Sequence, residues 1–212
     1  MKHKHIIGRI KMQIALATRN EGKIREMKSI LKGSGVELID YRELPPMEQP
    51  EENGETFLEN ALAKARAVHA ATGLHALADD SGIEVDELGG GPGVRSARYG
   101  GEGLSDRERS QRLLEELEGV PDERRGARFR CIMVLYPAPG TDVDAIVTEG
   151  IFHGRIATRP SGENGFGYDP VFFVPERGVT VAEMSDEEKN STSHRYRAGV
   201  EMKYMIMKSL GV

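Results

Sequence analysis

The sequence lacks the features that mark secreted and membrane proteins. It has 212 residues with one cysteine, Cys131, so an intrachain disulfide is excluded. That cysteine lies in the apolar run 129–135, and no neighbouring His or Asp would activate it as a nucleophile. No segment reaches the roughly twenty apolar residues of a membrane span, and Lys11 and Gln13 interrupt the N-terminal apolar run before it attains signal-peptide length. We therefore expect a cytoplasmic protein with no membrane partner and with Cys131 in a buried strand.

The chain also lacks an excess of basic residues. Its 29 Lys and Arg residues against 34 Asp and Glu residues give a net charge of -5, whereas duplex nucleic-acid binders usually carry a basic field. We therefore expect no nucleic-acid partner, and any phosphate binding must be local. Internal repeats and low-complexity tracts are absent from the sequence, and its length suits one domain or two closely joined lobes.

Hydrophobic periodicity predicts an alternation of strands and helices. Strands are expected over 12–17, 36–41, 74–78, 83–88, 127–136 and 143–156, the last two forming a hairpin around Pro139–Asp142. Helices are expected after Asn20, after the capping boxes Thr56/Glu59 and Ser105/Glu108, and from about His194 onward. This order predicts a mixed sheet flanked by helices, which is an α/β body.

The turn after the first expected strand is a candidate phosphate site. It leads into a helix N-terminus, where unpaired N–H groups and the helix dipole attract anions, and Lys23 adds a full positive charge. It is not a P-loop, because Ala17 and Ile24 stand where a glycine and a Ser or Thr are required. Phosphate binding and simple capping by Asn20 both stay open for its residues, Thr18, Arg19, Asn20, Glu21, Gly22 and Lys23.

Two acidic segments are candidates for a metal site. Asp79 and Asp80 are expected at the carboxyl end of a strand with Ser81 and Gly82, where they could bind a hard divalent cation and a polarised water. An ordinary Asp/Ser/Gly turn is the alternative. Glu51 and Glu52 come just before the second expected helix. The alternative for them is that they only interact favourably with the positive end of that helix dipole.

The segment 161–198 carries a stacking surface followed by a cluster of donors. Its turn at 165–170 offers glycines, two aromatic faces and a carboxylate, and Lys189, Ser193, His194 and Arg195 follow about twenty residues later. These groups suit a planar base with an anionic tail. The alternative is a Gly/aromatic turn followed by an ordinary helix start.

Six motifs in this order resemble the inosine triphosphate pyrophosphatase family. They are TRNEGK at 18–23, FLENALAKA at 57–65, ADDSG at 78–82, PGVRSARY at 92–99, GFGYDP at 165–170 and KNSTSHR at 189–195. The resemblance runs from about Met12 to the C-terminus and leaves 1–11 as an N-terminal extension without a counterpart. It implies one domain over 12–212 with two lobes, a long mixed sheet, a nucleotide cleft between the lobes, and a homodimer.

The resemblance also implies roles for individual residues. It places the phosphate loop on 18–23, the Mg²⁺ carboxylates on Glu52 and Asp80, and the acid that activates water on Asp80 as well. Ser81 matches a substrate contact, whereas Asp79 is either a second metal ligand or a supporting residue. The base and sugar pocket falls on Phe166, Gly167, Tyr168, Asp169, Lys189, His194 and Arg195. Two positions depart from the family: Arg19 stands where a small residue is frequent, and Arg95 where an aromatic is expected.

The expected reaction is Mg²⁺-dependent release of pyrophosphate from the purine nucleoside triphosphates ITP, dITP or XTP. His194 and Arg195 would donate to the 6-oxo group of the base, which adenine lacks, while Phe166 or Tyr168 lies against the ring. One alternative is a nucleotide-binding regulatory module without turnover, which would not need the acids Glu52, Asp80 and Asp169. Another is a pyrophosphatase for modified pyrimidines, for which the GFGYDP and SHR motifs would form the wrong pocket.

Overall fold

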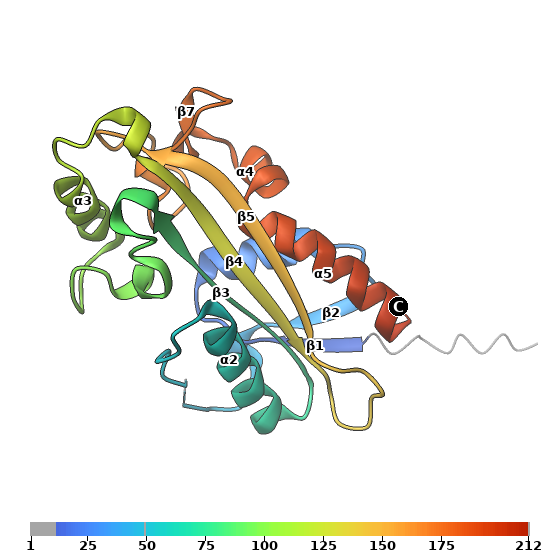
Figure 1. The fold of residues 1–212 in the computed structure, drawn as a ribbon. Helices are drawn as coiled ribbons and strands as arrows, with labels where there is room; N and C mark the ends of the chain where they lie inside the picture. The colour runs from blue at the N-terminus through green and yellow to red at the C-terminus, as the bar shows by residue number, and fades with distance from the viewer. Residues whose placement is uncertain (1–11, 49, 212) are drawn as a thin grey trace, which may run out of the picture.

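One mixed sheet organises the chain, as a computed structural model of residues 12–48 and 50–211 shows (Figure 1). The expected extension 1–11 lies outside the described residues. Seven strands follow the order β2-β1-β3-β4-β5-β6-β7, in which β1 is parallel to β2 and β3 and the other pairs are antiparallel. Their bounds are Met12–Leu16 (β1), Val36–Ile39 (β2), His75–Val85 (β3), Gly126–Tyr136 (β4), Ile146–Ile156 (β5), Phe172–Val174 (β6) and Val179–Thr180 (β7).

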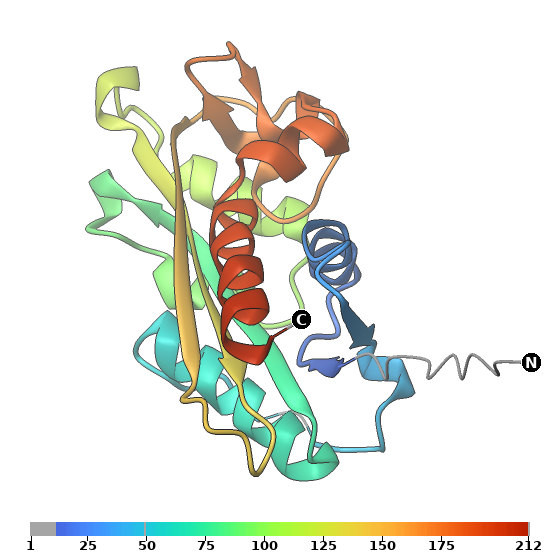
Figure 2. The ribbon, with the colours of Figure 1, turned by 90° about the vertical axis from the view of Figure 1, so that its right-hand side faces the viewer.

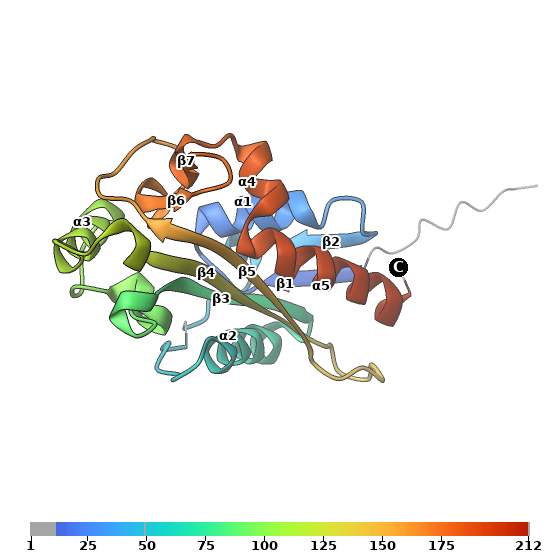
Figure 3. The same cartoon turned by 45° about the horizontal axis from the view of Figure 1, so that its top comes forward.

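Helices cover both faces of this sheet. They are α1 (Glu21–Ile30), α2 (Phe57–Thr72), α3 (Asp106–Glu116), α4 (Asp186–Thr192) and α5 (His194–Leu210). Helix α2 lies on one face, and α1 and α5 lie on the other (Figure 3). Alternation along β3 sends Ala76 and Ala78 into the core under α2 and Leu77 into the core shared with α1 and α5. The predicted α/β class is therefore confirmed.

A third core lies where the long strands extend beyond β1 and β2. There α3, β6 and β7 pack around the ends of β4 and β5 (Figures 1 and 2), and Leu113, Phe129 and Phe172 are among the buried residues. The long strands β3, β4 and β5 extend from the end of the molecule that holds β1 and β2 to the end that holds α3, β6 and β7. No helix in the described part of the chain is long and apolar enough to cross a membrane.

All four predicted helix starts are confirmed, including that of α5 at His194. The Asn20 side chain caps α1, and both predicted capping boxes are present at the starts of α2 and α3. Cys131 is fully buried in β4, where burial raises the pKa of its thiol. The sequence did not predict α4, β6 or β7, which are each short.

The two strands expected over 74–78 and 83–88 are one continuous strand, so that prediction is wrong. Asp79, Asp80, Ser81 and Gly82 pair with β4 from Met133 to Arg130, and the ladder runs through them without a turn. The pairing of β1 with β3 ends at Leu77. The two acids therefore lie in the middle of β3, next to the point where its neighbour β1 stops.

Gly150 allows the start of α5 to lie directly on β5. A Cβ added there would clash with the carbonyl oxygen of His194 and would lie 2.6 Å from the amide nitrogen of Ala198. We expect Gly150→Ala to lower the free energy of unfolding by about 1–3 kcal/mol, because the helix must shift to make room. Denaturant titration measures this loss, with Val147→Ala as the control on an exposed position of the same strand. Equal stability of the two variants would contradict this close packing.

Candidate functional site

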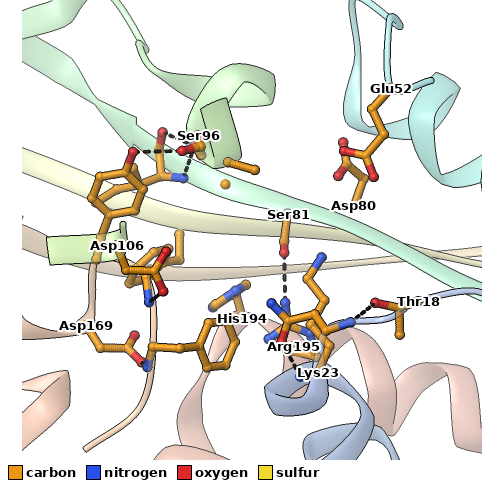
Figure 4. Close-up of a pocket in the computed structure, with 18 of the residues that line it drawn as sticks. Thr18, Lys23, Glu52, Asp80, Ser81, Ser96, Asp106, Asp169, His194 and Arg195 are labelled. Carbon is orange, nitrogen blue, oxygen red and sulfur yellow. Dashed lines mark hydrogen bonds between the residues drawn. The ribbon is translucent and has the colours of Figure 1, made fainter. Parts of the chain in front are cut away.

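A cavity of about 300 Å³ opens beside β3 where β1 ends. Its wall takes residues from the loop before α1, from α2, β3, α3 and the 166–169 segment, and from α4 and α5. Among the residues labelled in Figure 4, Glu52 and Asp80 lie together on one side, Ser96, Asp106 and Asp169 lie on the other, and Ser81, His194 and Arg195 lie between. Segments far apart in the sequence therefore meet around one space.

The predicted phosphate loop forms part of this wall. The Asn20 side chain accepts the amide N–H of Lys23 at 3.1 Å, so capping, one of the two alternatives, is present. Four loop residues line the cavity, namely Thr18, Arg19, Asn20 and Lys23. Glu21 instead pairs with Arg42 on the surface, and Gly22 lies against the ring of Phe166, 2.6 Å from where its Cβ would be. Gly22 thus provides room for the aromatic ring.

Asp80 projects from β3 toward α2, which presents two polar side chains one turn apart. Asn60 Nδ2 donates to Asp80 Oδ2 at 3.0 Å, and Lys64 Nζ lies 3.2 Å from Oδ1. Lys64 Nζ also lies 3.0 Å from Glu52 Oε1, so the two predicted metal carboxylates share one ammonium group. Burial raises the pKa of Asp80 above its ordinary value, and the charges of Lys64 and Lys23 offset only part of the rise.

The sequence prediction missed Asn60 and Lys64. Both lie at i and i+4 on the buried side of α2, among alanines, which is an unusual place for an amide and an ammonium group. That pattern was the signal that could have revealed them.

The carboxylate pair fits a magnesium ion bound together with a nucleotide. In residues 12–48 and 50–211, no group of three or more His, Cys, Asp and Glu side chains is placed to hold a metal ion. A closed protein cage is therefore not present there. Mg²⁺ in phosphate-transfer sites is usually held by one or two carboxylates and by substrate phosphates. Glu52 and Asp80 already surround one cation, the ammonium of Lys64, which matches that kind of open site.

Asp79 points to the opposite face of β3 and is fully buried. Its Oδ2 lies 3.0 Å from Lys23 Nζ and 3.0 Å from Arg195 Nη2. Burial opposes ionisation of Asp79, but the charges of Lys23 and Arg195 outweigh it and hold the pKa of Asp79 below its ordinary value. Asp79 therefore supports these two cations from behind the cavity.

A second buried network joins the predicted base-pocket residues. Asp169 Oδ2 lies 2.7 Å from Lys189 Nζ, and Glu26, on α1, pairs with both Lys189 and Arg195. The Lys189 ammonium lies 4.3 Å from the centre of the Phe166 ring. Sequence reasoning did not identify Glu26, whose acidic side chain is buried on an otherwise amphipathic helix.

Arg195 is the most buried cation of the site, with 1% of its surface exposed. It donates twice to Asp79, once to Glu26 at 2.5 Å, and once to Ser81 Oγ at 2.7 Å. Its guanidinium thus fixes α5 to β3 and α1 while it lines the cavity.

His194 and Tyr168 form aromatic parts of the wall. The His194 ring stacks on Phe129 with centroids 4.8 Å apart, and burial, with the charges of Arg195 and Lys189, lowers its pKa well below the ordinary value. The ring is therefore neutral near pH 7, and its buried Nδ1 has no hydrogen-bond partner within the described residues. The Tyr168 hydroxyl donates to the carbonyl of Ser96 at 2.8 Å, which holds together the part of the cavity wall that these two residues form.

Helix α3 also contributes to the cavity, which the sequence did not predict. Asp106 Oδ2 accepts the amide N–H of Gly167 at 2.8 Å, and the Ser110 hydroxyl donates to the Gly167 carbonyl at 3.2 Å. Arg109 lines the cavity and pairs with Asp106.

Six basic side chains line the cavity against four acidic ones, although the whole chain has a net charge of -5. The basic side chains are Arg19, Lys23, Lys64, Arg109, Lys189 and Arg195, and the acidic ones are Glu52, Asp80, Asp106 and Asp169.

Comparison with known proteins gives a consistent result. Residues 14–205 match the model of the Ham1 family. A dITP/XTP pyrophosphatase of Yersinia pestis is 49% identical over 186 residues, which cover 88% of this chain and 93% of the relative. A solved HAM1 protein of Coxiella burnetii has 41% identity and a TM-score of 0.83, covering 93% of this chain and 99% of its own. A nucleoside-triphosphatase/dITP/XTP pyrophosphatase of Mycobacterium abscessus has 43% identity and a TM-score of 0.73, with coverage of 90% and 98%.

Proposed function

Because this chain belongs to the Ham1 family, we propose that it is a hydrolase that cleaves non-standard purine nucleoside triphosphates (ITP, dITP and XTP) between the α and β phosphates. The observation that carries the proposal is the position of the Glu52–Lys64–Asp80 cluster in the same cavity as Lys23 and the α1 N-terminus. One side of the cavity thus offers carboxylates for a cation, and the adjoining loop offers donors for phosphates. Removing such nucleotides would keep them out of DNA and RNA.

The basic side chains would bind the triphosphate and stabilise the leaving group. Lys23 and the N–H groups at the start of α1 would hold the departing pyrophosphate, because negative charge accumulates there as the bond breaks. Lys64 adds a further charge beside Asp80. When bound with the substrate by Glu52 and Asp80, Mg²⁺ supplies positive charge that neutralises the triphosphate.

Asp80 is the residue that we assign to water activation. Its carboxylate lines the cavity, and Asn60 and Lys64 hold its orientation. A water beside Asp80 would pass a proton to it while attacking the α phosphorus in line with the leaving group. Asp79 would act indirectly, by holding Lys23 and Arg195.

The part of the cavity lined by Phe166, Lys189, His194 and Arg195 would bind the base. Phe166 lies beside Lys189 and Arg195 and offers a ring face for stacking, and His194 lines the same space. We propose that His194 and Arg195 donate to the 6-oxo group of hypoxanthine or xanthine. The amino group of adenine would face these donors instead, and unpaired donors in a closed pocket can discriminate by several powers of ten.

The products test the proposed reaction. With ITP and Mg²⁺, we expect IMP and pyrophosphate in equal amounts, because bond cleavage at the α phosphorus releases both at once. Chromatography of early time points separates IMP from IDP, and a coupled assay quantifies pyrophosphate. The same assay with dITP, XTP, GTP and ATP ranks the substrates. IDP as a major early product would contradict α–β cleavage and indicate stepwise phosphate release.

A regulatory module without turnover remains the alternative from another class. It would bind ITP without consuming it, so the product assay distinguishes the two. The single domain of two lobes, the homodimer, the cytoplasmic location and the lack of a nucleic-acid partner stay predictions from the resemblance and composition.

A further inference from the structure

Arg109 is a cavity cation most of whose N–H donors have no partner within residues 12–48 and 50–211. It lies on α3, its side chain is 17% exposed, and its Nη2 lies 3.1 Å from Asp106 Oδ1. Within residues 12–48 and 50–211 this is its one carboxylate contact, whereas Arg195 donates to three side chains. A guanidinium has five N–H donors in a rigid fork. Most donors of Arg109 are therefore available to a ligand in the cavity it lines.

Arg109 belongs to the side of the cavity away from the phosphate loop. Its partner Asp106 lies in Figure 4 across from Glu52, Asp80 and Thr18. Asp106 also accepts the Gly167 N–H, and the neighbouring Tyr168 lines the same cavity as Arg109. A nucleotide with its triphosphate at the loop would extend its base toward the side of the cavity that Asp106 and Arg109 line.

The purine edge that carries the 6-oxo group also carries C2. If the 6-oxo group is bound by His194 on α5, as proposed above, the C2 side of this edge would face the wall to which α3 contributes Asp106 and Arg109. The C2 substituent is a hydrogen in hypoxanthine, an oxygen in xanthine and an amino group in guanine. Only xanthine presents an acceptor there.

We propose that Arg109 reads the C2 substituent of the base: its free N–H groups donate to the 2-oxo group of xanthine and reject the 2-amino group of guanine. The rejection arises because two donors would face each other and both would lose their hydrogen bonds to water. This inference rests on the proposed function and refines it, since it makes XTP the preferred substrate and explains how GTP is spared despite its 6-oxo group.

Variants of Arg109 test the proposal through ratios of kcat/KM. Arg109→Met should lower kcat/KM for XTP about tenfold more than for ITP, because a hydrogen bond to a charged group is lost only with the 2-oxo base. Arg109→Glu places acceptors at this position and should raise kcat/KM for GTP relative to XTP. Arg112→Met is the matched control, since Arg112 lies one turn further along α3 and pairs with Glu115 and Glu116 on the surface. It should leave all the ratios unchanged.

Equal losses of kcat/KM with ITP, XTP and GTP in both Arg109 variants would overturn the inference, and would show that Arg109 acts by holding Asp106 against Gly167. Thermal unfolding of each variant verifies that it is folded. If Arg109→Met and Arg109→Glu do not fold, Arg109→Lys keeps the charge beside Asp106 but loses the fork, and its XTP/ITP ratio must fall for the inference to hold. Failure of the parent enzyme to release pyrophosphate from ITP would instead refute the proposed function.

Discussion

Asp80→Asn should lower kcat for ITP by about 10²–10⁴-fold, the range for loss of a general base. The substitution keeps the volume of the side chain but removes its negative charge. Asn60 and Lys64, which both donate to Asp80, would then face an amide with one acceptor oxygen and a donor group. The variant therefore loses the base and one of the two carboxylates that we assign to the cation.

The measurement is single-turnover hydrolysis of ITP, with thermal unfolding and ITP binding recorded for the same preparation. We expect the variant to be folded and to bind ITP, since Lys23, Lys189 and Phe166 are untouched. Glu51→Gln is the matched control, because Glu51 is an exposed neighbour of Glu52 that accepts a hydrogen bond from Asn53. Hydrolysis by Asp80→Asn within a few fold of the parent rate would show that Asp80 is not the base.

Local sequence rules were sufficient for the elements that begin at caps or follow a clear period. Asn20, Thr56 and Ser105 each mark a helix start in the sequence, and the side chain of each accepts the expected backbone N–H. The buried position of Cys131 also followed from the apolar run around it. These features depend on residues within one turn of each other, so the sequence contains the information directly.

The middle of β3 could not be predicted in the same way. Asp79, Ser81 and Gly82 are typical of turns, because a buried carboxylate in a strand is costly without a partner. Here the compensating cation Arg195 lies 116 residues away along the chain. The strand therefore continues through residues that local propensity assigns to a loop.

The same limit applies to the cavity. The motifs cover most of the residues that line it. However, the sequence assigned no role to Lys64, whose partners Glu52 and Asp80 lie in other segments, and it did not predict Arg109, whose place depends on where α3 lies. Glu26 was missed for a similar reason, since its two cations come from α4 and α5. Tertiary pairing determines the function of these side chains, and the local sequence does not show which residues are their partners.

Arg195→Ala should lower the free energy of unfolding by about 3–5 kcal/mol, as expected when one member of a buried ion pair is removed. Arg195 is 1% exposed and contacts Asp79 and Glu26, which are 0% and 7% exposed. Without the guanidinium, Asp79 keeps Lys23 and Glu26 keeps Lys189, but each carboxylate is left short of donors in a buried place. The first turn of α5, which carries His194, would also lose its link to β3.

The pH dependence of this loss follows from Glu26. Burial opposes ionisation of Glu26, but the charges of Arg195 and Lys189 hold its pKa in the folded protein below the ordinary value of 4.5. A lowered pKa contributes stability that is present above the unfolded-state pKa and is lost as the pH falls through the folded-state pKa. The difference in the free energy of unfolding between the parent and Arg195→Ala should therefore have its full size near pH 7. It should become smaller once the pH falls below about 4.5.

Denaturant titrations at several pH values measure this difference, with Arg197→Ala as the control. Arg197 is exposed on the same helix and donates to the carbonyl of Thr192, so its loss should cost less than about 0.5 kcal/mol. Kinetics below the unfolding temperature then separate the two roles of Arg195. If it also reads the base, kcat/KM falls more for ITP than for ATP, whereas an equal fall for both assigns Arg195 to structure alone. A variant as stable as Arg197→Ala would contradict the buried network itself.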